Sequence, residues 1–387
     1  MRPTALRFVA VTVFSFILGT SVNAQSQPRV VTTAVPFLRI SPDARSGGMG
    51  DLSLATTPDV SSPFFNLGKV PFNTSPAGVS VTYTPWLKNI VNDVFLASIA
   101  GYYKIDDLQS ISGAFRYFSL GSIQFTDDRG QTLGSQNPRE LGIDAGYSRR
   151  LSDRVGLGVG MKFIYSNLAS GQSQGTGATF KPGTAVAADL GLYYNAHNEA
   201  GQGWAFGAAL SNLGSKIGYT DNADQKDFIP ANFGIGTFYT KVIDESNKIS
   251  FGVDLNKLLV PTPPADTSSA AVFQAYRDKG VISSWFSSFG DAPGGFGEEL
   301  KEFQISAGGE YNYNDQFAFR AGYFHEGRNK GNRRYFTVGV GVKYNVFGLN
   351  FSYLVPTGSG INQNPLSNTL RFSLLFDLSG EAAGDFE

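Results

Sequence analysis

The sequence contains no cysteine and only two histidines, His197 and His325. Without cysteine there can be no disulfide bond, no thiol catalysis and no cysteine-ligated metal. We expect His197 in a short turn and His325 near the opposite end of a strand, so the two cannot share a metal. No Ser-His-Asp arrangement is present, and the glycine runs GLGVG and VGVGVK lie inside strand-like segments rather than before a helix. We therefore expect no enzymatic activity, no cofactor and no metal site.

Charged residues and long apolar runs are also scarce. Charged residues make up 16% of the 387 residues, well below the quarter that is typical of soluble domains. The net charge of −1 argues against nucleic acid as a partner. Mean hydropathy is −0.11, and beyond the first residues no apolar segment is long enough to cross a membrane as a helix. Aromatic residues (13%) and glycines (46) are abundant instead, which favours a β-barrel whose alternate residues face lipid and lumen.

The first residues have the pattern of a cleavable signal peptide. Arg2 and Arg7 supply a positive start, residues 8–18 are apolar, and Val22-Asn23-Ala24 is a small-residue cleavage motif. Residues 1–24 are therefore expected to be removed on export, and Gln25 to begin the mature chain.

Period-two alternation is the main structural signal from residue 78 onwards. In residues 155–165 the odd positions are Val, Leu, Val, Met, Phe and Tyr, whereas the even ones are mostly glycine. Residues 140–148, 249–256, 335–345 and 369–378 alternate in the same way. The runs are long enough to cross a bilayer at a tilt and longer than the strands of most soluble sheets. They predict an all-β fold, a transmembrane antiparallel β-barrel over residues 78–379 followed by a short tail at 380–387.

We expect fourteen strands, joined alternately by tight turns and longer loops. The strands are expected at 78–84, 94–104, 110–126, 139–150, 154–167, 183–195, 203–214, 230–241, 247–258, 303–314, 316–326, 334–346, 348–356 and 368–379. The tight turns are expected at 106–107, 152–153, 243–246, 314–315 and 347–348, and the loops at 127–138, 168–182, 215–229, 259–302, 327–333 and 357–367. Short turns face the periplasm in outer-membrane barrels, so this count predicts that both termini lie in the periplasm.

The polar face of the strands carries charges of both signs amid many glycines. We expect these charges to form structural ion pairs in the lumen rather than a catalytic site. They are Arg116, Asp144, Lys162, Asp189, Asp254, Glu310, Arg320, Lys343, Arg371 and Asp377.

Residues 25–77 precede the barrel and do not alternate. They are expected to plug the periplasmic mouth of the barrel or cap its lower rim, and a plug that fills lumen volume is favoured over a moving gate. Glycines on the lumenal face would make room either for this plug or for a ligand. The motif residues of the segment are Pro42, Asp43, Arg45, Gly48, Met49 and Gly50.

The 259–302 loop is far longer than a connection requires, and loops of this length are usually functional. Ser268 or Ser269 is expected to cap a helix that ends near residue 284. Aromatic residues here either bind a partner or pack down over the barrel mouth as a lid, and composition leaves both interpretations open. The candidate partner-binding residues are Tyr276, Trp285, Phe286 and Phe289 in this loop and Trp86 after the first strand.

Two segments of the sequence resemble the PorV family of type IX secretion proteins. They are PFLRISPDARSGGMGDLSLATTPDVSSPFFNLGK and SVTYTPWLKNIVNDVFLASIAGYYK. The first is shared with related barrels such as PorQ, whereas YTPWL and the overall length favour PorV.

The resemblance implies a FadL-like barrel in the outer membrane of the Bacteroidota. Such a protein would bind the C-terminal signal domains of secreted cargo as they leave a SprA-type translocon. It would then deliver them to the PorU sortase complex for attachment to lipopolysaccharide. The family has also been linked to lipid A deacylation, for which we find no catalytic residues. The alternative is a FadL-type transporter of hydrophobic small molecules, which the polar lumenal face disfavours.

Overall fold

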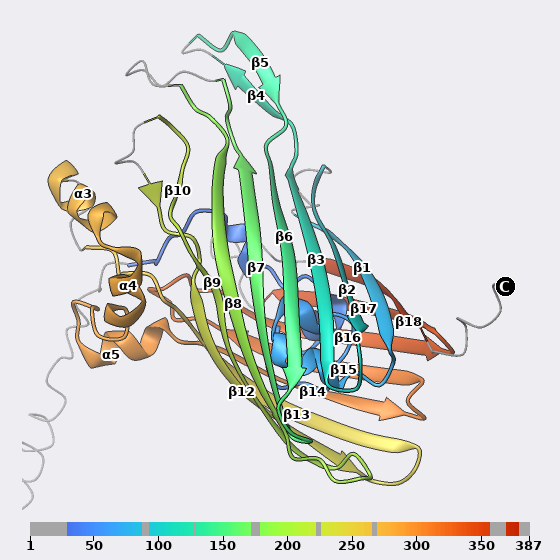
Figure 1. Cartoon of the computed structure of the whole chain (residues 1–387). Helices are drawn as coiled ribbons and strands as arrows, with labels where there is room; N and C mark the ends of the chain where they lie inside the picture. Colours follow the sequence, from blue (N-terminus) through green and yellow to red (C-terminus); the bar gives the residue numbers. More distant parts are fainter. Residues whose placement is uncertain are drawn as a thin grey trace, which may run out of the picture.

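The computed structural model describes residues 29–378 except 87–92, 127–128, 172–178, 222–225, 265–268 and 357–368. The expected signal peptide and the tail at 380–387 lie outside the described residues. Fourteen antiparallel strands form a closed barrel in which β1 pairs with both β2 and β18 (Figure 1). The predicted fold class is therefore confirmed.

The barrel strands lie close to their predicted positions, and only the third departs by more than two residues. They are β1 (Ala77–Pro85), β2 (Val94–Lys104), β3 (Gln109–Leu120), β6 (Arg139–Arg150), β7 (Val155–Asn167), β8 (Gly183–Asn195), β9 (Gly203–Gly214), β12 (Asn232–Val242), β13 (Asn247–Leu258), β14 (Gln304–Tyr313), β15 (Phe317–His325), β16 (Arg334–Tyr344), β17 (Phe347–Pro356) and β18 (Leu370–Leu378).

The third predicted strand, 110–126, is wrong at its outer end. The chain leaves the barrel at Gly121, whose φ of +79° is a left-handed conformation that favours glycine. Residues Ile123–Thr126 (β4) then pair with Thr132–Gln136 (β5) in a separate two-stranded sheet. The alternating pattern continues through the break, so the sequence did not reveal it. The tight turn expected at 347–348 lies instead at 345–346, because Phe347 already pairs with Tyr344.

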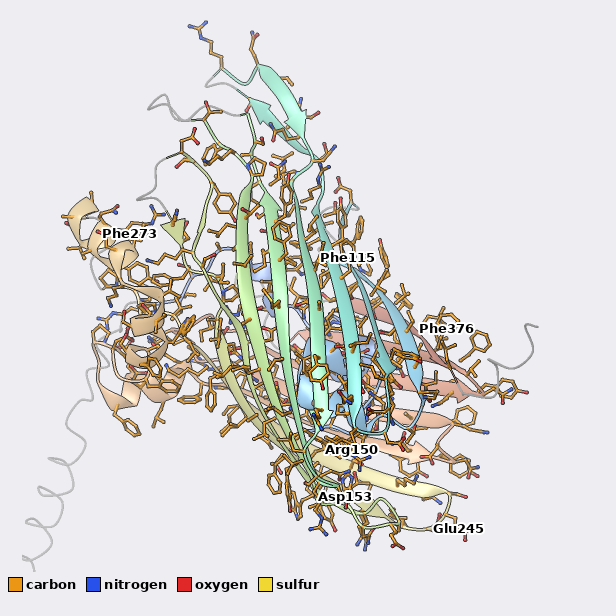
Figure 2. The ribbon with its side chains drawn as sticks, viewed as in Figure 1. Phe115, Arg150, Asp153, Glu245, Phe273 and Phe376 are labelled. Atoms are coloured by element: carbon orange, nitrogen blue, oxygen red, sulfur yellow. The ribbon has the colours of Figure 1, made fainter. Side chains whose placement is uncertain are left out.

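The apolar positions of the strands point outward and the small or polar positions point into the lumen. Figure 2 shows the side chains of Phe115 and Phe376 on the outside of the wall. In β18, Leu374 is exposed on the outside, whereas its neighbour Ser373 is buried. The outward residues are those that would contact lipid.

The N-terminal segment lies inside the barrel, where Figure 1 shows it in blue behind the strands. Its short helices are η1 (Pro36–Arg39), α2 (Ala44–Gly48), η2 (Ser62–Phe64) and η3 (Leu67–Phe72). Helix α2 contacts β15 to β18, and η3 contacts β6 to β8 on the other side of the lumen. The segment therefore spans the interior from wall to wall.

The segment starts at the long-loop end of the barrel. The backbone N–H of Arg29 donates to the carbonyl of Asn329 (3.0 Å), and that of Ala34 donates to Phe228 (2.9 Å), both in long loops. The chain then descends through the lumen to Ala77 at the short-turn end, where β18 also finishes. The expectation that both ends lie in the periplasm is thus wrong for the described start of the chain. The count of turns places the start of β1 at the periplasmic end of the barrel, but it does not determine the course of the N-terminal segment that precedes β1.

The 259–302 loop contains several helices, which Figure 1 shows grouped on one flank of the molecule. They are α3 (Ala270–Asp278), α4 (Val281–Ser287), α5 (Phe296–Glu299) and the 3-10 turn η4 (Leu300–Glu302). The single helix expected up to residue 284 is broken at Lys279, whose backbone is extended. In the neighbouring loop, β10 (Ile217–Gly218) pairs with β11 (Lys226–Asp227).

Candidate functional site

The PDAR motif holds the N-terminal segment at the centre of the lumen. Asp43 caps α2 by accepting hydrogen bonds from the backbone N–H groups of Arg45 (3.1 Å) and Ser46 (3.2 Å). This cap fixes the helix so that the Arg45 guanidinium reaches Glu310 of the wall (2.9 Å) and Asp59 of the segment (2.8 Å). Arg320 also donates to Glu310 (2.5 Å). The buried Glu310 carboxylate is therefore shared by two arginines.

The other motif residues contact the wall directly. The carbonyl of Pro42 accepts a hydrogen bond from the Ser98 hydroxyl (2.7 Å), and the N–H of Gly50 donates to the Thr337 hydroxyl (2.8 Å). A Cβ on Gly48 would lie 3.1 Å from the backbone of the wall glycine opposite it. Met49 is buried in an apolar cluster between the segment and the wall.

Several of the lumenal charges pair with one another or with the segment. Lys162 lies between Asp144 (3.1 Å) and Asp189 (3.0 Å) on the strands to either side of it. Near the short-turn end, Lys343 contacts Asp377 (2.5 Å).

Arg371, by contrast, pairs with Asp51 of the N-terminal segment (3.6 Å) rather than with another strand. The barrel therefore supplies one partner of this ion pair and the segment the other.

The ion-pair prediction is wrong for Arg116 and Asp254. Arg116 donates to the backbone carbonyls of Leu38 (3.0 Å) and Phe64 (3.3 Å) and lies over the Phe64 ring. Asp254 accepts from the backbone N–H groups of Ser53 (2.7 Å) and Leu54. Both charged groups are hydrogen-bonded by peptide groups of the segment, because backbone donors and acceptors buried in a lumen also need partners.

Lumenal glycines make room for the segment. A Cβ on Gly207 would lie 2.1 Å from the carbonyl oxygen of Leu54, and one on Gly322 would lie 2.1 Å from the carbonyl carbon of Met49. The space left on the outer side of the segment is a cavity of about 140 Å³ with polar lining residues such as Arg39, Arg116 and Asn212. A second cavity, of about 390 Å³, lies on the short-turn side beside Arg45, Glu310 and Lys343. The chain itself thus fills the middle of the lumen.

A buried ion network holds the long loop against the barrel. Lys257, at the outer end of β13, is fully buried between Glu299 (3.0 Å) and Glu302 (2.5 Å). Lys330 of the β15–β16 loop bridges Glu302 and Glu298 (both 2.7 Å), and Glu298 also pairs with Arg29 (2.9 Å). The loop is therefore tied to a strand, to a second loop and to the start of the N-terminal segment.

The charged form of Glu302 is favoured by this network. Burial alone would raise the pKa of its carboxyl, but hydrogen bonds from Lys257, Lys330 and Thr262 outweigh burial and place the pKa below its ordinary value. The Glu302 carboxyl is therefore ionised at neutral pH.

Of the expected partner-binding aromatics, Tyr276 is buried and Trp86 is half-buried. Tyr276 is buried beside Phe228, and its hydroxyl donates to the carbonyl of Pro261 (3.2 Å). Trp86 packs on Phe118 at the barrel's outer end, with ring centroids 5.0 Å apart. Tyr276 therefore stabilises the loop and is not placed to meet a partner, whereas Trp86 packs on the rim and stays partly accessible.

The remaining loop aromatics are more accessible. Trp285 is half-buried, Phe289 is exposed but touches Phe233 by its edge, and Phe286 is 76% exposed. A residue that is three-quarters exposed is not packed down as a lid.

Sequence reasoning missed three exposed apolar residues in the same loop. Ile282 lies four residues before Phe286, on the same helical face, and Phe296 and Leu300 are exposed on α5 and η4. The spacing of Ile282, Phe286 and Phe289 was visible in the sequence and could have identified that face. We refer to Ile282, Phe286, Phe289, Phe296 and Leu300 together as the α4–α5 apolar residues.

No helix in the described part of the chain is long and apolar enough to cross a membrane. Among the same residues, no group of three or more acidic or histidine side chains is arranged to hold a metal ion.

A closed fourteen-stranded barrel whose lumen holds its own N-terminal segment is a FadL-like outer-membrane barrel. The fold is similar to the Pseudomonas putida toluene transporter TodX, with 10% identity over 88% of this chain and 99% of that chain and a TM-score of 0.52. It is also similar to the Ralstonia pickettii toluene transporter TbuX, with 11% identity over 87% and 97% of the two chains and a TM-score of 0.50. At these identities the likeness shows the fold alone.

The family model of the type IX secretion system protein PorV matches residues 23–265. The chain belongs to this family, as its sequence predicted, and has a role in type IX secretion at the outer membrane. No curated protein matches the chain in sequence.

Proposed function

We propose that this barrel is an adaptor that collects secreted proteins rather than a channel that conducts them. It binds the C-terminal signal domain of cargo leaving a SprA-type translocon and passes it to the PorU sortase complex for attachment to lipopolysaccharide. Family membership supports the secretion role, and the family resemblance supports the nature of the cargo and partners. The proposal assigns no catalytic step to the barrel.

The exposure of the α4–α5 apolar residues is the observation that carries the proposal. Phe286 and Phe296 are 76% and 77% exposed, and exposed aromatic groups of this size commonly mark protein contacts. They lie on a loop that the Lys257 and Lys330 ion pairs hold in place. A surface fixed in advance loses little conformational entropy on binding, which favours affinity.

The filled lumen supports the same proposal. The N-terminal segment contacts both sides of the wall, and Arg45 joins it to Glu310 through a buried ion pair. A barrel occupied in this way offers its outer surface, rather than its interior, to a protein partner.

The test replaces Phe286 and Phe296 with serine in the full-length protein. Exposed positions tolerate such changes in most proteins, so we expect normal barrel assembly together with reduced release or attachment of cargo. Heat-modifiable gel mobility reports assembly, and secreted cargo is measured in the same strain. Tyr344→Ser is the matched control, because Tyr344 is similarly exposed (71%) but lies at the short-turn end. Normal secretion by the assembled double variant would contradict the proposal.

The second candidate is transport of hydrophobic small molecules, which the fold shared with the toluene transporters favours. The lumenal cavities disfavour it, because the larger one is lined by charged residues such as Arg45, Glu310 and Lys343 and the smaller one by a mixture of polar and apolar residues, whereas pockets for such ligands are mostly apolar. Purification of the barrel from outer membranes, followed by mass spectrometry, separates the two. Co-purified exported proteins with a common C-terminal domain support the adaptor, whereas a bound apolar compound alone supports the transporter.

A further inference from the structure

We infer that the lumenal cavity on the outer side of the N-terminal segment is a binding site for one small tetrahedral oxyanion such as phosphate. The cavity, of about 140 Å³, is well below the roughly 300–1,000 Å³ of pockets that take larger organic ligands. Three arginines line it: Arg39 of the segment, Arg116 of β3 and Arg333 of the β15–β16 loop. The site is independent of the cargo-binding surface proposed above.

Arg116 is the residue that most clearly lacks a negative partner. Its side chain is buried in the lumen, and its two Nη atoms donate to the backbone carbonyls of Leu38 (3.0 Å) and Phe64 (3.3 Å). Its Nε has no hydrogen-bond partner among the described residues. Carbonyl groups satisfy donors but carry no counter-charge, and a buried charge without one is costly. An anion in the cavity supplies both the missing charge and the missing acceptor.

The other two arginines share a single carboxylate. Glu326 is buried and pairs with Arg39 (3.1 Å) and with Arg333 (2.8 Å). Each guanidinium group has five N–H donors, and one carboxylate cannot accept from all ten. Both arginines therefore keep donors for a second anion.

Aromatic rings hold two of the guanidinium groups in place. Arg116 lies over the Phe64 ring, 4.7 Å from its centroid, and Arg333 lies over the Phe324 ring at 5.2 Å. Both rings also line the cavity. Because a ring packs on the flat face of a guanidinium group, the N–H groups at its edge remain available to an oxyanion. The arginines therefore lose little conformational entropy when the ion binds.

The charge balance around the cavity is positive. Asp51, which also lines it, pairs with Arg371 (3.6 Å). Asp144 and Asp189 attract Arg116 from beyond ion-pair distance, but each pairs directly with Lys162. Five cations thus meet four carboxylates, and the excess lies at Arg116. The cations are Arg39, Arg116, Arg333, Arg371 and Lys162, and the carboxylates are those of Asp51, Asp144, Asp189 and Glu326.

The lining chemistry identifies the ligand class. Guanidinium groups match the oxygen spacing of phosphate with paired N–H donors, and here they come from the segment, the wall and a loop. Asn256, Gln304 and Ser306 add amide and hydroxyl groups to the same cavity. A tetrahedral ion presents oxygens in several directions and so can accept from all of these groups at once. The bound ion therefore joins the N-terminal segment to the barrel wall and to the β15–β16 loop.

The test measures binding of radioactive inorganic phosphate to the full-length barrel in detergent by equilibrium dialysis at constant ionic strength. We expect one saturable phosphate per barrel, displaced by sulfate but not by chloride. Arg39→Met and Arg116→Met each remove one arginine from the cavity. We expect each change to weaken binding about tenfold or more, the usual contribution of a hydrogen bond between charged groups.

Arg45→Met is the matched control. Arg45 also joins the segment to the wall inside the lumen (2.9 Å to Glu310), but it does not line this cavity. This variant should therefore lose stability yet keep its affinity for phosphate. Arg39→Met keeps Arg333 as the partner of Glu326, so it remains a test even where Arg116→Met does not assemble, and gel mobility of the folded form reports assembly of each variant.

Affinity for phosphate that is equal in the Arg39 variant and the Arg45 control overturns the inference. Displacement of phosphate by chloride at the same ionic strength would show charge screening only, and would also overturn it. The same holds for uptake that does not saturate at one ion per barrel.

Discussion

Replacing Arg45 with methionine tests whether the ion network in the lumen holds the N-terminal segment in place. Methionine retains much of the arginine volume but none of its donors. The change removes the bonds to Glu310, to Asp59 and to Thr57. Glu310 keeps Arg320 as a partner (2.5 Å), whereas Asp59 loses its ion-pair partner.

The expected loss is about 3–5 kcal/mol in the free energy of unfolding, the cost of leaving one partner of a buried ion pair without the other. The control is Lys343→Gln, which breaks a contact of similar length to Asp377. The Lys343 side chain is 48% exposed, and exposed ion pairs contribute only about 0–1 kcal/mol. The difference in lost unfolding free energy between the two variants therefore measures the effect of burying an ion pair, because both variants lose an ion pair but only one of these pairs is buried.

Urea-induced unfolding in lipid vesicles measures both values, and planar bilayers report the state of the lumen. We expect the unaltered barrel to be closed and the Arg45 variant to show added ion current. Equal losses of stability in the two variants would refute the reasoning, because the lumen would then be as well solvated as the rim. Steady currents of porin size from the unaltered barrel would refute the filled lumen itself.

The remaining predictions concern the outer face, the loop and the segment. Leu374→Arg should cost about 2–4 kcal/mol, because this exposed residue lies at the middle of β18; folding yield equal to that of Leu374→Phe would contradict its orientation. The lowered pKa of Glu302 means that its contribution to stability is complete above the ordinary value of 4.5 and is lost as the pH falls through the lower folded value. Hydrogen exchange of the 259–302 loop should therefore rise in acid, and Glu302→Gln should flatten that dependence. A disulfide introduced between positions 44 and 373 should leave secretion unchanged, because the Ala44 N–H of the segment already donates to the Ser373 hydroxyl of the wall (2.9 Å) and the chain has no other cysteine; blocked secretion would indicate a moving gate.

The alternation of apolar and small residues predicted the barrel strands well because the two faces of each strand have different surroundings. Residues such as Leu157 and Val159 contact lipid while Gly156 and Gly158 face the filled lumen, so the period of two is enforced along the whole strand. At Gly121 alternation no longer identifies a barrel strand, because β4 and β5 continue the alternating pattern outside the barrel wall. A left-handed glycine is compatible with a bulge, a turn or a strand end, and the sequence does not distinguish among them.

The lumenal contacts were harder to predict because the wall residues bind groups of the N-terminal segment, whose sequence has no periodicity. The wall charges were identified from the strands, but Arg116 and Asp254 bind peptide groups that carry no sequence signature. Similarly, aromatic composition located the long loop as a candidate surface without separating Tyr276, which is buried, from Phe286, which is not. That separation depends on how α3 packs against Phe228, a contact between distant parts of the chain.

The number and placement of the lumenal contacts argue for a segment that stays where it is. Displacing it would break the Arg45 pairs near the centre, the hydrogen bonds to Asp254 on one wall and the Arg29 pair with Glu298 at the outer end. The loss of the buried Arg45 pairs costs about 3–5 kcal/mol and the loss of the hydrogen bonds to the buried Asp254 carboxylate about 1.5–3 kcal/mol, so together these losses are a large share of the stability of a typical domain, about 5–15 kcal/mol. A partner that bound the loop would have to return this free energy through contacts specific to the displaced state. We therefore expect the loop surface to act while the segment remains in the lumen, which is what distinguishes an adaptor from a gated channel of the same fold.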